Sequence, residues 1–225
     1  MKVSLVSLTN STLLPSRSGD EHSYECLSTE ELIVYAARVS NPANQMNHET
    51  APRLIHHLIK SGHWSPFEMA NMCLEVITSR GIAPQILRHR SFSFQEFSQR
   101  YAEAVDVEVY KARRQDSKNR QNSIDDMSPE DITWFIDAQA AVWAQSFDLY
   151  KQALARGIAK EQARFLLPLG TQTKLYINGT IRSWIHYLQA RTAEGVQKEH
   201  RDIALEAQKI FIEHFPNIAQ ALEWK

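Results

Sequence analysis

Hydrophobic residues recur at helical spacing over one long stretch, which begins at Ser128-Pro129 and ends near Arg156-Gly157. The repeating positions are Ile132, Phe135, Ile136, Ala140, Trp143, Phe147, Tyr150 and Leu154. This spacing predicts a long helix with an aromatic stripe on one face. A stripe of this kind is far more often buried core than a cofactor surface, so we expect this helix to organise the hydrophobic core.

Shorter patterns predict further helices and a few strands. Val3 and Leu5 alternate with polar neighbours, which indicates a first strand. Other strands are predicted at 72–77, 105–109 and 175–177, and other helices begin near residues 28, 48, 82, 160, 180 and 196. Residues 10–23 are a predicted loop, and the polar segment 111–127 is a predicted exposed excursion. With no repeat and no linker, residues 1–225 are expected to form a single domain.

Two helix-start signals stand out. Ser28 and Glu31 have the spacing of a capping box. Ser65 and Glu68 repeat that spacing, with Pro66 at the first helical position. The start of a helix leaves backbone N–H groups free, so the second signal predicts a site for an anion or a carbonyl group at Ser65.

Bulk composition excludes several classes of protein. The formal net charge of −1 disfavours general nucleic-acid binding, so any cation-dependent binding must be local. Cys26 and Cys73 are the only cysteines and form no CxxC, which argues against a disulfide scaffold or a structural zinc site and fits a reducing compartment. The sequence shows neither a signal peptide nor an apolar run of membrane-spanning length. We therefore expect a soluble, cytoplasmic protein.

The segment 88–101 concentrates charge and aromatic rings. Arg88, His89 and Arg90 are followed by serines, a carboxylate, three phenylalanines and Arg100. Arginine offers a planar fork of donors that suits phosphate and carboxylate oxygens. The segment thus predicts an anion pocket with an aromatic wall. The alternative is a basic loop whose arginines pair with nearby acids and whose phenylalanines anchor it to the core.

Two rival functions remain open at this point. Arg88, Arg90 and Arg100 with Phe92 and Phe94 are also compatible with an RNA- or phosphate-binding module, in which cations and stacking rings hold the ligand. The second rival is a metal hydrolase using His56, His57 and His63. Their spacing argues against it, because adjacent residues leave a helix in different directions, and we expect no metal. Arg191 falls at the edge of an apolar stripe, where it either snorkels or lies beside a ligand.

Four ordered motifs resemble those of the flavin-dependent thymidylate synthases. Arg88-His89-Arg90, seven residues and then Ser98, with Arg100-Tyr101 behind it, resembles the signature of that family. His63-x-Ser65-Pro66-Phe67-Glu68 precedes it, and Arg164 with Leu167-Pro168-Leu169 follows. The last motif runs from Arg182 to Tyr187, with Arg191 beyond it. Together the motifs cover roughly residues 37–200.

The resemblance implies a fold and a reaction. The fold is α+β, a helix-rich domain with a small mixed or antiparallel sheet, assembled as a homotetramer with shared active sites. The reaction is reductive methylation of dUMP to dTMP, with methylenetetrahydrofolate as one-carbon donor, FAD delivering hydride and NADPH as reductant. The protein supplies placement and electrostatics while the cofactor carries the hydride chemistry. Neither cysteine has a reactive-looking context, which suits such a mechanism.

The resemblance also assigns residues to ligands. The positions that match dUMP contacts are Gln85, Ile86, Leu87, Arg88, Glu96, Phe97, Ser98, Gln99, Arg100, Arg164 and Arg191. The positions that match FAD contacts are His63, Ser65, Arg88, His89, Arg90, Glu96, Thr180, Ile181, Arg182 and His186. Asn178 is an alternative to Thr180. Arg191 matches the catalytic arginine, which in the family polarises the uracil with a permanent positive charge.

Overall fold

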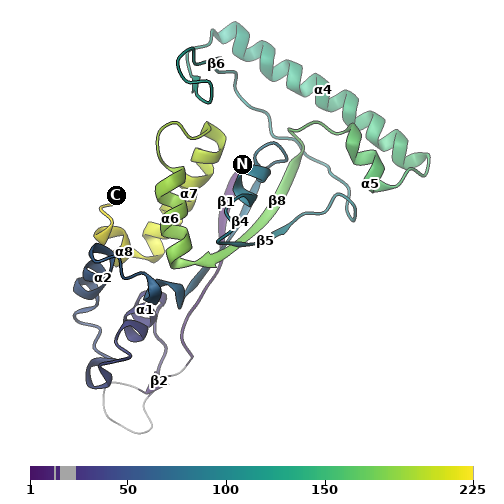
Figure 1. Ribbon diagram of the computed structural model, residues 1–225. Coiled ribbons are helices and arrows are strands. Elements are labelled where there is room, and N and C mark those ends of the chain that lie inside the picture. The colour runs from purple at the N-terminus through teal and green to yellow at the C-terminus, as the bar shows by residue number, and fades with distance from the viewer. Residues whose placement is uncertain (13, 16–23, 225) are drawn as a thin grey trace.

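The computed structural model describes residues 1–12, 14–15 and 24–224. A four-stranded antiparallel sheet lies at the centre of the fold (Figure 1). Its strands, in the order β1-β4-β8-β5, are β1 (Lys2–Leu8), β4 (Asn71–Ser79), β8 (Gln172–Thr180) and β5 (Ser93–Glu96). The strands predicted near the N-terminus, at 72–77 and at 175–177 are confirmed. The observed class is therefore α+β, helix-rich with a small antiparallel sheet.

Helices from both halves of the chain complete the core. They are α1 (Thr29–Ala37), α2 (Ala51–Lys60), α6 (Ile181–Arg191), α7 (Lys198–His214) and α8 (Pro216–Ala221). Ile33, Ile55, Leu74, Trp184 and Phe211 are fully buried members of one contiguous cluster between these helices and the sheet. β4 supplies alternate side chains to the cluster, as the period of two requires.

Local signals place several of these helices correctly. The Ser28 hydroxyl accepts from the Glu31 amide while the Glu31 carboxylate accepts from the Ser28 amide, so the predicted capping box is confirmed. Gly62 follows α2 with a φ of 69°, a conformation that glycine adopts without strain. The final helix α8 was not predicted, because six residues are too few to show a helical period.

The long helix α4 (Pro129–Ala155) is present but does not organise the core, so that expectation was wrong. It projects away from the sheet together with α5 (Lys160–Ala163) (Figure 1). Within α4 only Tyr150 and Ala153 are buried, in a small separate cluster with Ala163. Trp134 is 69% exposed. The periodicity correctly identified an apolar face, but that face lies outside the core of this chain.

Two other expectations were wrong. Residues 105–109 form no strand; only Val107 makes an isolated bridge, to Thr171, and its neighbours Val105 and Val109 are exposed. Ser65 does not cap an α-helix. Residues 65–68 form the 3₁₀ helix η2 (Ser65–Glu68), whose N-cap position is Trp64, and the chain enters β4 directly afterwards. The predicted helix-start anion site at Ser65 is therefore lost.

Short elements complete the chain. They are β2 (Leu14–Pro15), β3 (Tyr24–Glu25), η1 (Pro42–Asn44), α3 (Ala83–Leu87), β6 (Arg114–Gln115), β7 (Ser123–Ile124) and η3 (Arg164–Leu166). Most of the predicted loop 10–23 lies outside the described residues. In the part of the chain described here, none of the helices has the length and apolarity needed to cross a bilayer.

Candidate active site

The arginine-rich segment 88–101 divides into two parts joined by β5. The first part, with Arg191, is here named the His89 corner and consists of Gln85, Arg88, His89, Arg90 and Arg191. Gln85 lies within α3, a helix of five residues anchored by Ile86, which is 1% exposed, and residues 88–90 follow this helix. Arg88 and Arg90 are exposed, and neither guanidinium bonds to another described residue. The two cations are therefore available to a ligand.

His89 turns inward and meets Arg191 from the end of α6. Nε of Arg191 donates to Nε2 of His89 over 2.7 Å. Arginine nitrogens only donate, so Nε2 must be unprotonated. Burial, and then the charge of Arg191, lower the pKa of His89. His89 is thus a neutral acceptor that orients the guanidinium.

Tyr187 and His200 form a buried pair behind the His89 corner. The Tyr187 hydroxyl and His200 Nε2 are 3.0 Å apart, and the Tyr187 ring meets His89 edge-on at 4.8 Å. His200 is completely buried, and burial, Arg191 and His89 together lower its pKa to about 4. Burial raises the pKa of Tyr187. Arg191 is consequently the one permanent cation among these four side chains.

The second part is here named the Glu96 arm and consists of residues 96–100 with Arg164. Glu96 accepts from Arg80 Nη1 over 2.7 Å and from the Thr173 hydroxyl over 3.0 Å. Arg80 also donates to the Phe97 carbonyl oxygen over 2.6 Å. Burial lowers the pKa of Arg80, an effect that Glu96 opposes and Arg164 increases. Arg80 therefore locks the start of the arm to the end of β4.

The far end of the arm is tied to α5 through Glu161. Nε of Arg100 lies 3.1 Å from a Glu161 carboxylate oxygen, and Nε of Arg164 donates to the Glu161 carbonyl over 3.2 Å. Ser98 Oγ accepts from the Arg100 amide at 3.3 Å. Gln99 is buried, and its Nε2 finds no partner among the described residues. The arm thus brings together two guanidiniums, a hydroxyl and an unsatisfied amide, a donor set that suits an anionic ligand.

A third group, here named the Trp64 corner, combines His63, Ser65, Thr180, Arg182 and His186. Trp64 packs against His186 with ring centroids 5.1 Å apart, and Arg182 pairs with Glu68 of η2. The predicted helix start at Thr180 is confirmed, because its hydroxyl accepts from the Ser183 amide. His63, Ser65 and His186 are exposed, so their polar atoms can reach a ligand.

Thr180 and Asn178 point to the same face of β8, since they are two residues apart. The Thr180 hydroxyl is occupied by the helix cap and by Ser183. Asn178 is exposed, and its side-chain amide forms no hydrogen bond with another described residue. Ile181, another predicted flavin contact, is fully buried in the core, so its backbone but not its side chain could face a ligand.

Phe92 of the segment is a scaffold residue. Phe92 is 9% exposed and packs against Trp184 at 4.8 Å and Tyr187 at 5.7 Å. Gly179 leaves room for it, because an added Cβ there would lie 2.3 Å from Phe92 Cδ1. A ring held in this way cannot stack on a nucleic-acid base, so Phe92 gives no support to the RNA-binding alternative.

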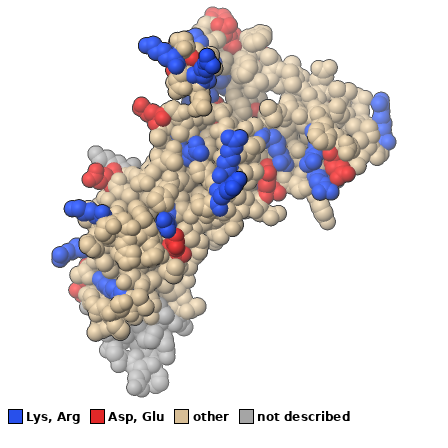
Figure 2. Space-filling view, in the orientation of Figure 1, with Lys and Arg blue, Asp and Glu red and all other residues tan. Residues whose placement is uncertain are grey.

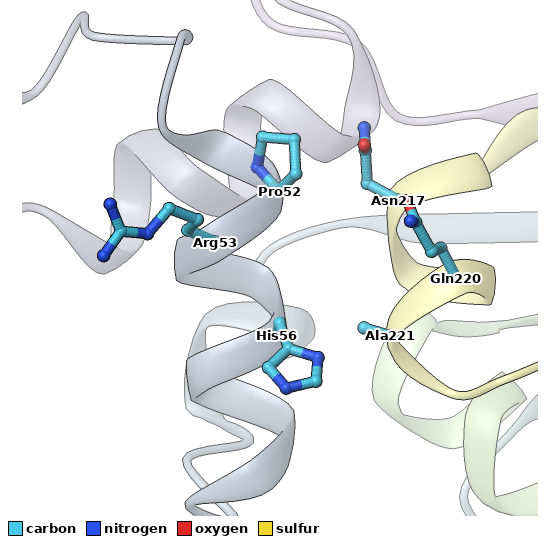
Figure 3. A pocket seen from close by; sticks show the side chains of 6 residues that line it. All are labelled: Pro52, Arg53, His56, Asn217, Gln220 and Ala221. Atoms are coloured by element: carbon cyan, nitrogen blue, oxygen red, sulfur yellow. The ribbon is translucent and has the colours of Figure 1, made fainter.

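The histidines predicted to be poor metal ligands point to different places. His56 faces a cavity of about 440 Å³ between α2 and α8, together with Arg53 and Asn217 (Figure 3). His57, its neighbour, lines another cavity beside Arg38 and Asn44. No group of three or more His, Cys, Asp or Glu side chains within the described ranges has metal-binding geometry. Cys26 and Cys73 are free thiols, and burial raises the pKa of Cys73.

Several contributors escaped the sequence patterns. Arg80, Glu161 and Gln197 hold predicted site residues in place, yet none lies in a predicted motif. One feature of the sequence could have identified Arg80, because it is a charged residue directly after an apolar strand. Although the net charge is −1, Lys and Arg side chains gather along the middle of one face of the molecule (Figure 2). This gathering is compatible with a net charge of −1 and with the expectation that cation-dependent binding is local.

The fold and site define a class first: a helix-rich α+β protein whose exposed guanidiniums suit anionic ligands. Residues 24–217 match the family described as thymidylate synthase complementing protein. The chain is 60% identical over 200 residues to a flavin-dependent thymidylate synthase of Synechocystis, covering 89% of this chain and 92% of that one. It is 57% identical over 198 residues to a probable enzyme of the same name from Paramecium bursaria Chlorella virus 1, covering 88% and 92%.

A solved structure agrees with this assignment. The UMP/dUMP methylase PolB from Streptomyces cacaoi, bound with 5-Br dUMP, superposes with a TM-score of 0.81 at 25% identity, covering 99% of this chain and 94% of that one. The chain belongs to the thymidylate synthase complementing protein family, that is, the flavin-dependent thymidylate synthases. The resemblance carried by the four sequence motifs is thereby confirmed.

Proposed function

We propose that this chain converts dUMP to dTMP by reductive methylation in de novo dTMP biosynthesis, with methylenetetrahydrofolate as one-carbon donor and NADPH as reductant. The observation that carries the proposal is the contact between Arg191 and His89. In this contact Arg191, which matches the catalytic arginine, lies beside the residue between Arg88 and Arg90, two exposed arginines whose guanidiniums bond to no other described residue. A fixed cation beside a pyrimidine stabilises negative charge on the ring without exchanging a proton.

The nucleotide would be held by two groups of residues. Arg100, Arg164 and Ser98 in the Glu96 arm offer charge-assisted and hydroxyl hydrogen bonds, which suit the phosphate. Gln85, Arg88 and Arg191, with the backbone of Ile86 and Leu87, would face the base. Glu96 and Phe97 hold the arm against Arg80, and Gln99 offers a buried amide that lacks a partner among the described residues.

The residues present also fit FAD. Exposed Arg88 and Arg90 with Ser65 and Arg182 supply donors for a diphosphate, while His63, His89 and His186 supply flat polar rings. Glu96 and either Thr180 or Asn178 complete the set, with the Ile181 backbone beside them. When bound, the flavin supplies the hydride that a methylene group needs to become methyl. The chain contributes orientation and charge.

We also propose a homotetramer with shared active sites in the cytoplasm. Support comes from α4, which exposes five large apolar side chains, those of Trp134, Phe135, Ile136, Val142 and Leu149. A hollow of about 230 Å³ lies between α4 and the segment that carries Pro168, and Trp134 and Val142 line it. Large exposed apolar patches mark protein interfaces. The matched flavin positions also lie on separate elements, which suits completion by a second copy of the chain.

One experiment tests the proposed reaction. Purified protein is examined by visible absorption with added FAD, then given NADPH, dUMP and methylenetetrahydrofolate. We expect flavin absorbance that NADPH bleaches, followed by formation of dTMP that depends on dUMP. A protein that neither binds FAD nor forms dTMP under these conditions would disprove the proposal.

A further inference from the structure

The excursion 111–127 is fastened to the body of the protein by a buried ion pair. Arg113 Nη1 lies 2.6 Å from a Glu199 carboxylate oxygen, and the two side chains are only 14% and 6% exposed. Glu199 stands at the start of α7. The other ion pairs of the excursion, Lys111–Asp125 and Arg114–Asp126, have side chains 44% exposed or more. Arg113 and Glu199 therefore differ in kind from their neighbours.

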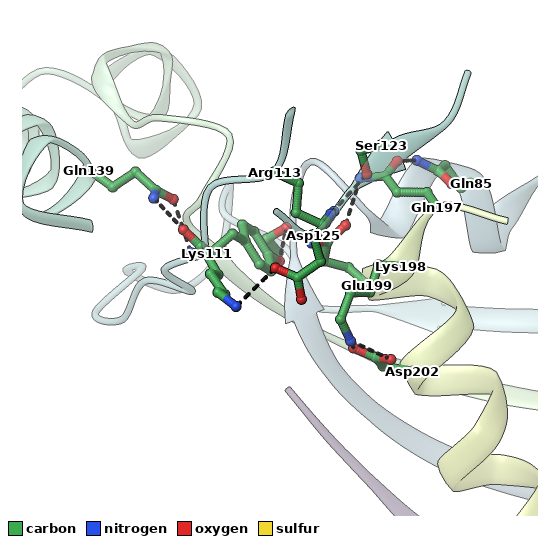
Figure 4. A network of polar contacts seen from close by, with 12 residues as sticks. Gln85, Lys111, Arg113, Ser123, Asp125, Gln139, Gln197, Lys198, Glu199 and Asp202 are labelled. Carbon is green, nitrogen blue, oxygen red and sulfur yellow. Dashed lines mark hydrogen bonds and ion pairs between the residues drawn. The ribbon is translucent and has the colours of Figure 1, made fainter. Parts of the chain in front are cut away.

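The anchor continues into the His89 corner through a line of hydrogen bonds (Figure 4). Gln197 Nε2 donates to the second carboxylate oxygen of Glu199 over 3.0 Å. The Gln197 carbonyl oxygen in turn accepts from Gln85 Nε2. Two side chains, those of Glu199 and Gln197, thus connect Arg113 to Gln85, which matches a substrate-binding position.

The ionised state of the Glu199 carboxylate fixes which groups donate and which accept along this line of hydrogen bonds. Burial tends to raise the pKa of Glu199, but the hydrogen bonds from Arg113 and Gln197 outweigh it and the net pKa is lowered. An ionised carboxylate only accepts, so the Gln197 amide must turn its NH₂ toward Glu199 and its oxygen toward Gln85. Gln85 must then donate through Nε2, which leaves its own carbonyl oxygen free to accept from a ligand.

A buried ion pair adds little net stability, because desolvation offsets most of the attraction, but it can specify one geometry. The pair also bears on the connection between α6 and α7, which begins just after Arg191. That connection is held at its other end by Arg201, whose Nε donates to the Thr192 carbonyl over 2.9 Å.

We propose that Arg113 and Glu199 are positioning residues for Gln85: their ion pair anchors the excursion to α7 and, through Gln197, sets which end of the Gln85 amide faces the nucleotide base. This inference rests on the proposed function. It assigns the excursion a role in substrate binding although none of its residues matches a ligand-contacting position.

Kinetics with matched variants test the line of hydrogen bonds. Glu199→Gln keeps the shape of the side chain but lets the Gln197 amide turn over. We expect the KM for dUMP to rise about three- to tenfold, the worth of one oriented hydrogen bond, with little change in kcat. Asp202→Asn is the control, since Asp202 is a carboxylate of the same helix whose partner is Lys198. Arg113→Gln should behave like Glu199→Gln, whereas the adjacent Arg114→Gln should resemble wild type.

A double-mutant cycle separates positioning from general destabilisation. In a Gln85→Ala background, Glu199→Gln should raise the KM no further, because the side chain through which it acts is gone. Equal effects of Glu199→Gln with and without Gln85 would overturn the proposal. So would a rise in KM for Asp202→Asn as large as that for Glu199→Gln.

Two measurements do not require turnover, so they distinguish failure of this inference from failure of the proposed function. Loss of the anchor should speed tryptic cleavage at Lys118 and Arg120 in Glu199→Gln but not in Asp202→Asn. A crystal structure of Glu199→Gln should show the bond between Gln197 and Gln85 lost. An unchanged bond together with unchanged cleavage refutes the inference even if wild-type protein forms dTMP.

Discussion

Nε of Arg191 donates to Nε2 of His89 over 2.7 Å, a contact that joins residues 102 positions apart in the chain. It makes the end of α6 and the arginine-rich segment one electrostatic unit. Burial and the neighbouring guanidinium keep His89 neutral, so the unit carries its charge on Arg191. A cation held by a neutral acceptor keeps its full charge, which a carboxylate partner would partly cancel.

Replacing Arg191 should remove most turnover without unfolding the protein. Arg191→Ala deletes the fixed charge, and we expect kcat to fall by about a hundredfold or more, as for other preorganised charge stabilisers. Arg191→Lys should recover little, because an ammonium group lacks the planar fork that bonds to His89. Rates of dTMP formation and circular dichroism measure the two effects. Arg156→Ala, an exposed arginine after α4, is the control. Wild-type turnover by Arg191→Ala would contradict the assigned role.

Stability should fall in acid because His200 is buried in its neutral form. Its pKa is about 4 in the folded protein against 6.5 for the ordinary side chain. As the pH drops through this window, the unfolded chain takes up a proton that the folded chain refuses. This favours unfolding by about 2 kcal/mol between about pH 7.5 and about pH 5. Urea unfolding should show that much less acid sensitivity in His200→Gln. His56→Gln, at an exposed histidine, should keep the wild-type dependence, and an unchanged dependence in His200→Gln would disprove the assignment.

Gly179→Ala should destabilise the protein through Phe92. The added methyl would lie 2.3 Å from the ring, which must then shift against Trp184 and Tyr187. We expect a loss of about 1–3 kcal/mol in the free energy of unfolding, typical of overpacking. Gly81→Ala is the matched control, since its nearest neighbouring atoms would be 3.6 Å away. Denaturant midpoints compare the two, and equal midpoints would show that Phe92 is not confined as described.

A charge among the exposed apolar side chains of α4 should break self-association. Trp134→Glu places a carboxylate in the exposed apolar patch, whose burial in an interface would then be strongly unfavourable. Sedimentation velocity should show a smaller assembly with helix content retained. Val39→Glu introduces the same charge at another position that is also 69% exposed, and should leave the assembly unchanged. A tetramer that survives Trp134→Glu would show that the surface around Trp134 is not an interface.

Sequence patterns identified features that neighbouring residues form, and they missed features that depend on residues distant in the chain. Ser28 and Ser128 begin helices through contacts within a few residues, so their caps were legible in the chain. The stripe on α4 was equally legible, but periodicity says only that a face is apolar and not what covers it. The predicted strand at 105–109 failed for the same reason, because alternation does not guarantee a neighbouring strand.

The candidate site shows the same division. Arg88, Ser98 and Arg191 were identified through motif resemblance, and the family membership is confirmed. The contacts of Arg191 with His89 and of Glu96 with Arg80 could not be foreseen, since each joins separate elements. Ser65 was assigned a helix start that four residues of 3₁₀ helix do not provide.

The brief pairing of β5 with β8 has a further consequence. β5 holds only four residues, from Ser93 to Glu96, and lies between the His89 corner and the Glu96 arm. An extended strand advances about 3.4 Å per residue and alternates its faces, so the four residues of β5 fix the spacing between the two groups. Deleting one residue of β5 would shorten the strand and turn every later side chain to the opposite face. The length of this strand therefore sets both the distance and the relative orientation of the His89 corner and the Glu96 arm.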